Sequence, residues 1–200
     1  KRKPFYSCLA LAGMLLTACA QASDSAARTA GGEGEPSDLP KVLFFGDSIS
    51  GGYSAAVIEG LKGKAEVVKL GAVAGYRIIE EPLWQGRPAG YLNFGSALTC
   101  IYDFDRFEKH LSETKYDVIH FNFGLNDITR GRNRAWYNPP EQYAEHLERI
   151  VTLLKKNGAR IIWANTTPIP ENDPNRQAGE ERLYNELADK IIKKHDIPTN

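Results

Sequence analysis

The chain has 200 residues, a length typical of one domain, and 42% of them are hydrophobic, enough to build a buried core. Its 25 lysines and arginines balance its 25 aspartates and glutamates, so it lacks the positive charge excess of nucleic-acid-binding proteins. Three cysteines exclude a disulfide framework, because two lie in the first twenty residues; we expect the third, Cys100, to be a small buried hydrophobe.

The first residues have the organisation of an export signal. A basic start (residues 1–3) precedes a short apolar run (residues 9–16), which is shorter than the about 20 residues of a membrane-spanning helix. Residues 16–19 (LTAC) resemble a bacterial lipobox, whose cysteine is lipidated; the alternative is an ordinary signal peptide with an incidental cysteine. We therefore predict a lipoprotein signal peptide over residues 1–19, lipidation of Cys19, and a location on the periplasmic side of the outer membrane or on the cell surface.

The next segment, residues 20–40, is rich in alanine, serine, glycine and glutamate and has no aromatic residue. Such a composition cannot bury enough apolar surface to fold by itself. We predict a flexible tether here, followed by one folded domain over residues 41–200.

From Lys41 onward, short apolar runs alternate with amphipathic stretches, which predicts a parallel sheet covered by helices. The predicted strands are residues 42–45, 67–68, 118–123 and 161–164, and the predicted helices are residues 53–61, 143–156 and 180–194. Ser50 is the predicted N-cap of the first helix, and Gly158 ends the second. Residues 71–99 form an irregular connection long enough to be functional surface.

Polar residues gather where three of the predicted strands end, in residues 46–50 (GDSIS), 124–127 (GLND) and 165–168 (NTTP). Each segment alone has an ordinary structural explanation, as a helix cap or a turn. In an open parallel sheet, however, ligands bind outside the carboxyl ends of the strands. Three polar clusters at that one edge therefore indicate a functional site.

Three familiar strand–loop–helix motifs do not fit the first cluster. Gly46 and Gly51 have the spacing of a phosphate-binding P-loop, but Gly52 and Tyr53 replace its lysine and hydroxyl residues. The dinucleotide fingerprint G-x-G-x-x-G is absent after Gly46. Ser50 occupies the position of the last glycine in the G-x-S-x-G elbow of α/β-hydrolases.

The sequence instead resembles the SGNH (GDSL-like) hydrolase superfamily. Residues 45–50 (FGDSIS) are similar to its first block, and residues 124–127 (GLND) match its GxND block. The similarity extends through residues 116–123 and 163–170, as in one bacterial branch, and covers residues 41–200. It implies a three-layer α/β/α fold with a central parallel sheet, related to flavodoxin.

The resemblance also implies roles in acyl transfer. Ser48 would be the nucleophile that attacks an ester carbonyl, and the oxyanion would receive hydrogen bonds from the Ser48 backbone N–H, a glycine N–H and the Asn126 side chain. Losing one such donor typically costs about 2.7–4 kcal/mol of transition-state stabilisation. We expect Asp47 and Asp127 to brace the turns by hydrogen bonds.

The oxyanion glycine has two candidates. Gly75 closely follows the second predicted strand, whereas Gly95 precedes the helix that leads to the third. We favour Gly95, because Ile101, Phe104 and Phe107 after it keep the helix pattern of the family.

A serine nucleophile needs a general base, usually a histidine oriented by a carboxylate. The family supplies both from a C-terminal D-x-x-H, and the only such motif here runs from Asp117 to His120 along a predicted strand. At about 3.3 Å per residue, Asp117 would lie about 23 Å and His120 about 13 Å from the catalytic edge. We therefore interpret His120 as a hydrogen-bonded histidine in or beside the core. We expect the sequence to be C-terminally truncated, so that the fifth strand and the D-x-x-H loop of the family would follow Asn200.

These observations predict a carboxylic ester hydrolase that acts through an acyl-enzyme on Ser48 and deacylates, most simply deacetylates, a carbohydrate or another small ester. The alternatives are an acyltransferase on the same scaffold and a non-catalytic surface protein that binds glycan. No cofactor, metal or nucleic-acid partner is expected, and contact with a membrane would be through the lipid anchor.

Overall fold

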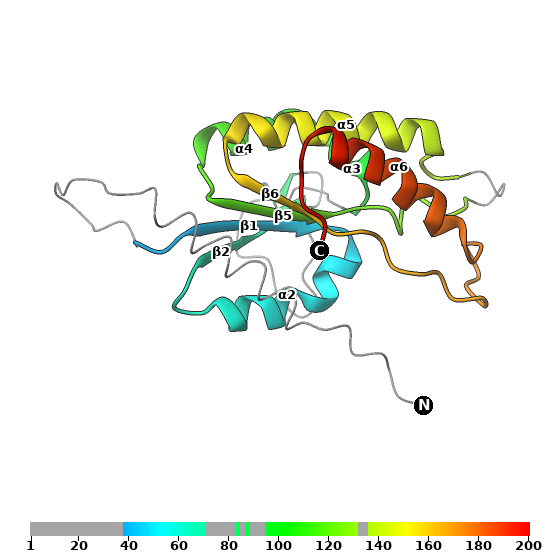
Figure 1. The fold of residues 1–200 in the computed structure, drawn as a ribbon, viewed down its shortest axis with the longest axis horizontal. Helices are drawn as coiled ribbons and strands as arrows, with labels where there is room; N and C mark the ends of the chain where they lie inside the picture. The colour runs from blue at the N-terminus through cyan, green and yellow to red at the C-terminus, as the bar shows by residue number, and fades with distance from the viewer. Residues whose placement is uncertain (1–37, 71–82, 85–86, 89–94, 132–135) are drawn as a thin grey trace.

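A computed structural model of the chain describes residues 38–70, 83–84, 87–88, 95–131 and 136–200. Its centre is a sheet of four parallel strands in the order β2-β1-β5-β6 (Figure 1). The strands are β1 (Lys41–Gly46), β2 (Glu66–Lys69), β5 (Val118–Asn122) and β6 (Arg160–Trp163). The carboxyl ends of β1 and β5 coincide, because Gly46 pairs with Asn122.

Helices cover both faces of this sheet. On one face lies α2 (Ser48–Leu61), and on the other lie α3 (Ala97–Tyr102), α4 (Phe104–Glu113), α5 (Pro140–Asn157) and α6 (Glu180–Lys194) (Figure 1). This arrangement confirms the predicted three-layer α/β/α fold. None of the helices in the described ranges has the length and apolar character needed to cross a membrane.

The strands of the sheet separate two cores, as their alternating side chains require. Val42 and Phe44 of β1 face the smaller core beneath α2, whereas Leu43 and Phe45 face the larger core beneath the other helices. Every residue of β5 is buried, which explains why this central strand reads as an almost continuous apolar run.

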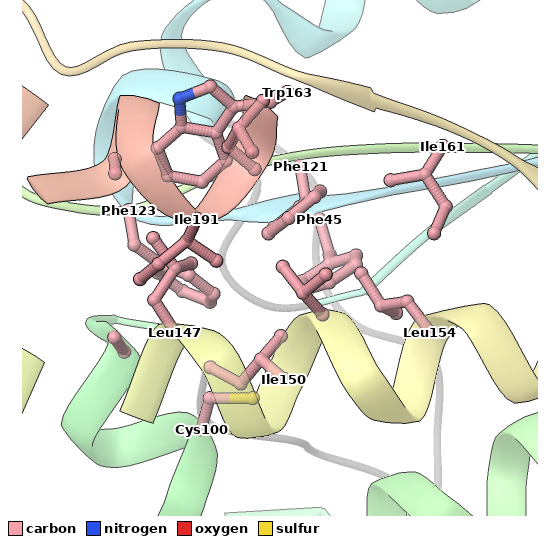
Figure 2. Close-up of a cluster of buried hydrophobic side chains, with 14 of the residues drawn as sticks. Phe45, Cys100, Phe121, Phe123, Leu147, Ile150, Leu154, Ile161, Trp163 and Ile191 are labelled. Atoms are coloured by element: carbon pink, nitrogen blue, oxygen red, sulfur yellow. The ribbon is translucent and has the colours of Figure 1, made fainter. Parts of the chain in front are cut away.

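Aromatic rings fill the larger core (Figure 2). The ring of Phe121 lies 5.4 Å from that of Phe45 and 4.9 Å from that of Trp163, measured between centroids. Helix α5 packs on these rings through residues such as Ile150. Cys100 of α3 is fully buried in the same cluster, as predicted, and burial raises the pKa of its thiol.

The helix ends confirm some sequence expectations and correct others. Helix α5 stops at Gly158, which adopts a left-handed conformation with φ 85°. The prediction of Ser50 as the N-cap of α2 is wrong: the helix begins at Ser48, and Asp47 is its cap. The chain turns into the helix immediately after Gly46, so Ser50 falls inside the first turn, where its hydroxyl donates back to the Asp47 carbonyl at 2.8 Å.

The connection over residues 71–99 contains more regular structure than predicted. A two-stranded antiparallel sheet pairs β3 (Leu83–Trp84) with β4 (Arg87–Pro88), and Ser96 caps α3 through a capping box with Thr99.

The end of the chain continues along the edge of the sheet beside β6. Trp163 donates from its backbone N–H to the Pro198 carbonyl at 3.0 Å and accepts from the Asn200 N–H at 3.0 Å, and Thr199 forms a parallel bridge with it. Residues 198–200 therefore already pair with β6 in the manner of a further parallel strand. The predicted signal peptide (residues 1–19), with Cys19, and residues 20–37 of the predicted tether lie outside the described residues.

Candidate active site

Ser48 lies at the carboxyl end of the central strand β1, on the first turn of α2. It is solvent-exposed, and its side chain makes no hydrogen bond to any described residue. Gly46 makes the sharp exit from β1 possible: its φ is +145°, and a Cβ there would lie 2.5 Å from the backbone oxygen of Asn122. The local fold thus presents a serine hydroxyl to solvent at the N-terminus of a helix, where negative charge is favoured.

Asp47 joins this turn to the neighbouring strand. Its side chain is only 1% exposed, and its Oδ1 accepts from the Ile49 backbone N–H at 2.9 Å and from the Asn122 Nδ2 at 3.1 Å. Burial raises the pKa of Asp47, and these two donors, the Leu125 N–H and the charge of Arg176 oppose the rise. Asp47 therefore stabilises the turn from its buried side, by hydrogen bonds to α2 and to the end of β5.

The second turn follows β5 and carries Asn126. It begins at Gly124, whose φ of +142° directs the chain against Thr166, so that a Cβ on Gly124 would lie 2.9 Å from the Thr166 Cβ. The Asn126 side chain donates from Nδ2 to the Gly95 carbonyl at 2.6 Å and accepts at Oδ1 from Arg176 Nη2 at 3.2 Å. The three predicted polar clusters are thus in contact: Asp47 links the first to the end of β5, and Gly124 packs against the third.

Asp127 fastens α3 to this turn. It is fully buried and accepts from the backbone N–H groups of Ala97 at 3.1 Å and Leu98 at 3.4 Å, and from Asn138 Nδ2 at 2.7 Å. Burial raises the pKa of Asp127 to about 7, although all three donors lower it. Because only the cap residue Ser96 separates Gly95 from α3, Asp127 also fixes the position of that glycine.

A cavity of about 280 Å³ opens between the Asn126 turn and the start of α3. It is lined by Gly95, Ser96, Thr99, Asn126, Thr129 and Tyr137. One candidate oxyanion glycine, Gly95, thus shares a cavity with Asn126, whereas Gly75 lies outside the described residues. The assignment of the glycine stays a prediction, and this contact supports Gly95.

Comparison with known proteins places this geometry in a family. Residues 44–199, most of the chain, match the GDSL-like lipase/acylhydrolase family. The chain belongs to this family. A curated GDSL esterase/lipase of Arabidopsis thaliana is 31% identical over 157 residues, which is 74% of this chain but only 57% of the relative.

Solved structures share the same fold. The chain resembles the acetyl xylan esterase AlAXEase with a TM-score of 0.56 at 19% identity, over 80% of this chain and 75% of the other. It resembles a GDSL-like lipase from Bacteroides thetaiotaomicron with a TM-score of 0.53 at 14% identity, over 92% and 76%. These likenesses confirm the fold of a GDSL (SGNH) hydrolase, as the sequence motifs predicted.

The D-x-x-H motif of this GDSL chain does not form a catalytic pair. The Asp117 carboxylate accepts from the Lys41 backbone N–H at 2.7 Å, at the start of β1, so it lies at the opposite end of the sheet from Ser48. His120 is fully buried beneath α2 and stacks on Phe44 with ring centroids 4.6 Å apart. Residues three apart on a strand point to opposite faces, which separates the two side chains further.

His120 lies in the core, as expected. Neither ring nitrogen has a partner of ordinary geometry among the described residues, although the nearby Asn200 side chain counteracts part of the pKa shift. Burial lowers the pKa of His120 to about 3, so the ring is neutral at physiological pH. Its role in this structure is that of a core aromatic ring.

The remaining histidines bind other partners or lie on a covering helix. His110 contacts the Tyr116 hydroxyl at 2.6 Å, His195 contacts Glu148 at 2.8 Å, and His146 lies on α5. In the ranges that the structure describes, no histidine hydrogen-bonds to Ser48, and no cluster of three or more His, Cys, Asp or Glu side chains could hold a metal ion.

The sequence reasoning missed three residues that support the site: Asn122, Asn138 and Arg176. Asn122 interrupts the apolar run of β5, and a polar residue at the end of a buried strand was a usable signal. Asn138 and Arg176 lie in irregular segments, where neither periodicity nor a motif distinguishes them from other polar residues.

Proposed function

We propose that this protein is a serine ester hydrolase that forms an acyl-enzyme on Ser48 and removes acetyl or other short acyl groups from a carbohydrate or another small ester. The observation that carries the proposal is the juxtaposition at one sheet edge: an exposed serine at the start of α2, and an Asn126 side chain on the adjoining turn. Membership of the GDSL family supports ester hydrolysis.

In the proposed reaction, the Ser48 Oγ attacks the ester carbonyl carbon while a general base takes its proton. Negative charge then develops on the carbonyl oxygen, where the backbone N–H of Ser48, the Asn126 Nδ2 and the N–H of Gly95 would donate hydrogen bonds. The tetrahedral intermediate collapses to an acyl-serine as the alcohol leaves with a proton, and water repeats the sequence to release the acid. Asp47 and Asp127 take no part in these bond changes; they hold the two turns.

The proposed reaction also needs a general base for Ser48. All four histidines of the chain are described, and their contacts place none of them on Ser48. We propose that a histidine beyond Asn200, oriented by a carboxylate, reaches Ser48 from the strand that starts beside β6.

The similar proteins suggest the substrate and the type of reaction. The acetylated carbohydrate substrate is suggested by the name of the similar acetyl xylan esterase and by the predicted export. Hydrolysis is preferred to acyl transfer or to glycan binding because the relatives above carry the names of esterases and lipases. We also propose that the protein is a lipoprotein, anchored through Cys19 on the periplasmic side of the outer membrane or on the cell surface.

The test is turnover of p-nitrophenyl acetate and of acetylated xylo-oligosaccharides by the full-length protein and its Ser48→Ala variant. We expect the substitution to lower kcat/KM by at least about 10³-fold, since a triad nucleophile is removed. The matched control is Ser54→Ala on the same helix, whose hydroxyl only donates to the Gly51 carbonyl at 3.0 Å. Activity of Ser48→Ala within tenfold of the wild type would refute the nucleophile, and acylated sugar formed from an added acceptor would favour the transferase.

A further inference from the structure

An arginine from a distant loop hydrogen-bonds to the turn that carries Asn126. Arg176 lies between β6 and α6, and its guanidinium makes three contacts. The Nε donates to the Leu125 carbonyl at 2.7 Å, the Nη2 donates to the Asn126 Oδ1 at 3.2 Å, and the Nη1 pairs with the Asp173 Oδ2 at 3.1 Å. The side chains of Arg176 and Asp173 are only 17% and 15% exposed, so this ion pair is partly buried rather than a surface pair.

These contacts decide which way the Asn126 carboxamide faces. Its Oδ1 accepts from a guanidinium that has only donors, and its Nδ2 donates to a carbonyl, that of Gly95, which can only accept. Rotating the amide by half a turn would place donor against donor on one side and acceptor against acceptor on the other. One Nδ2 hydrogen is used by Gly95, and the second remains for a ligand in the adjoining cavity.

The same contact affects the strength of the Asn126 donor. A positive charge hydrogen-bonded to the oxygen of an amide draws electron density from its nitrogen, and hydrogen bonds in such a chain strengthen one another. The guanidinium fork is suited to this task because it contacts the side chain of Asn126 and the backbone of Leu125 at once.

We propose that Arg176 is a positioning residue for oxyanion stabilisation: it holds the Asn126 carboxamide with its N–H toward the reacting carbonyl and strengthens that N–H as a donor. Asp173 in turn orients the guanidinium. The proposal rests on the proposed function for its catalytic consequence, whereas the orientation of the amide can be measured without turnover.

The catalytic test compares Arg176→Met, Arg176→Lys, Asn126→Ala and the double variant Asn126→Ala/Arg176→Met in the full-length protein. We expect Arg176→Met to lower kcat for p-nitrophenyl acetate by about 10- to 100-fold with KM changed less than about threefold, because the contact acts through the transition state. Arg176→Lys keeps the charge but not the fork, so it should recover part of the loss. In the Asn126→Ala background, Arg176→Met should change kcat by less than about threefold.

The matched control is Arg106→Met. Arg106 also pairs with an aspartate three residues earlier, Asp103, at 3.4 Å, but it lies on α4. Its loss should leave kcat and KM unchanged. A wild-type kcat in Arg176→Met, or an equal loss of kcat in the presence and absence of Asn126, would overturn the proposal, because Arg176 would then act elsewhere or only on the fold.

A second measurement keeps the two proposals distinguishable. The side-chain NH₂ signals of Asn126, assigned in a ¹⁵N–¹H spectrum by their loss in Asn126→Ala, should shift or broaden in Arg176→Met and stay unchanged in Arg106→Met. If the wild-type protein turns over no ester but these signals respond as expected, the proposed function fails and the positioning contact stands. Signals that do not respond to Arg176→Met would overturn the positioning role whatever the activity.

Discussion

Replacing Gly46 by alanine should damage the fold at the point where the nucleophile turn leaves the sheet. The new Cβ would lie 2.5 Å from the backbone oxygen of Asn122 and closer still to the Oδ1 of the same residue. That backbone oxygen belongs to β5, which is hydrogen-bonded on both sides within the sheet, so it cannot move aside. The φ of +145° is also strained for any residue with a side chain.

The two effects can be given rough magnitudes. A non-glycine residue in a sparsely populated backbone region costs about 1–3 kcal/mol, and overpacking of a buried site costs about 1–3 kcal/mol. We therefore expect Gly46→Ala to lower the free energy of unfolding by about 4 kcal/mol. For a domain of this size, that corresponds to a fall in Tm of about 8–16 °C.

The assay is urea and thermal unfolding of the full-length protein, followed by tryptophan fluorescence and circular dichroism. The matched control is Gly52→Ala in the interior of α2, where nothing lies within 4 Å of the added Cβ. There the same change should stabilise the protein by about 0.5–1 kcal/mol, because alanine has the higher helix propensity. If Gly46→Ala costs less than about 1 kcal/mol, the steric argument for this turn is wrong.

Three further predictions test other parts of the structure. Burial raises the pKa of Asp127 from 3.8 to about 7, so between these values the folded state holds a proton that the unfolded state has released. Stability should therefore fall as pH rises through this window, and Asp127→Asn should remove about 3 kcal/mol of the fall in unfolding free energy between pH 5 and pH 8. His120→Leu should keep ester turnover within about threefold and stability within about 1 kcal/mol, because an apolar group replaces a neutral ring whose nitrogens lack hydrogen-bond partners of ordinary geometry. A loss of activity as complete as that of Ser48→Ala would show that His120 is the base. Cys19→Ser should abolish lipid labelling and release the protein from the membrane fraction, and unchanged labelling would exclude the lipoprotein assignment.

The elements that could be predicted are those in which burial dictates the residue pattern. The predicted helix over residues 180–194 coincides with α6, and the central strand was visible because both of its faces are covered. The start of α2 was misplaced, because both Asp47 and Ser50 are good caps and only the turn at Gly46 decides between them. The break between α3 and α4 at Asp103 has no glycine or proline to mark it.

Residues of the candidate site could be predicted where they belong to a sequence motif. They could not be predicted where only tertiary contacts bring them to the site. Ser48 and Asn126 follow from their positions after two buried strands. Arg176 comes from a loop with no periodic pattern, about fifty residues from the side chain that it contacts. Asn138 likewise reaches Asp127 from an irregular segment before α5. Such contacts depend on how loops pack, which local sequence does not encode.

The charges around the site explain why a cation on the Asn126 turn matters. Two buried carboxylates, Asp47 and Asp127, lie close enough for the first to raise the pKa of the second. Their field opposes the formation of an oxyanion nearby, since it is weakly screened away from water. The hydrogen-bond donors to these carboxylates are neutral, so they do not cancel this field. Arg176 lowers the pKa of Asp47 and contacts the amide oxygen of Asn126, so its charge offsets the carboxylates at the one donor that it also orients.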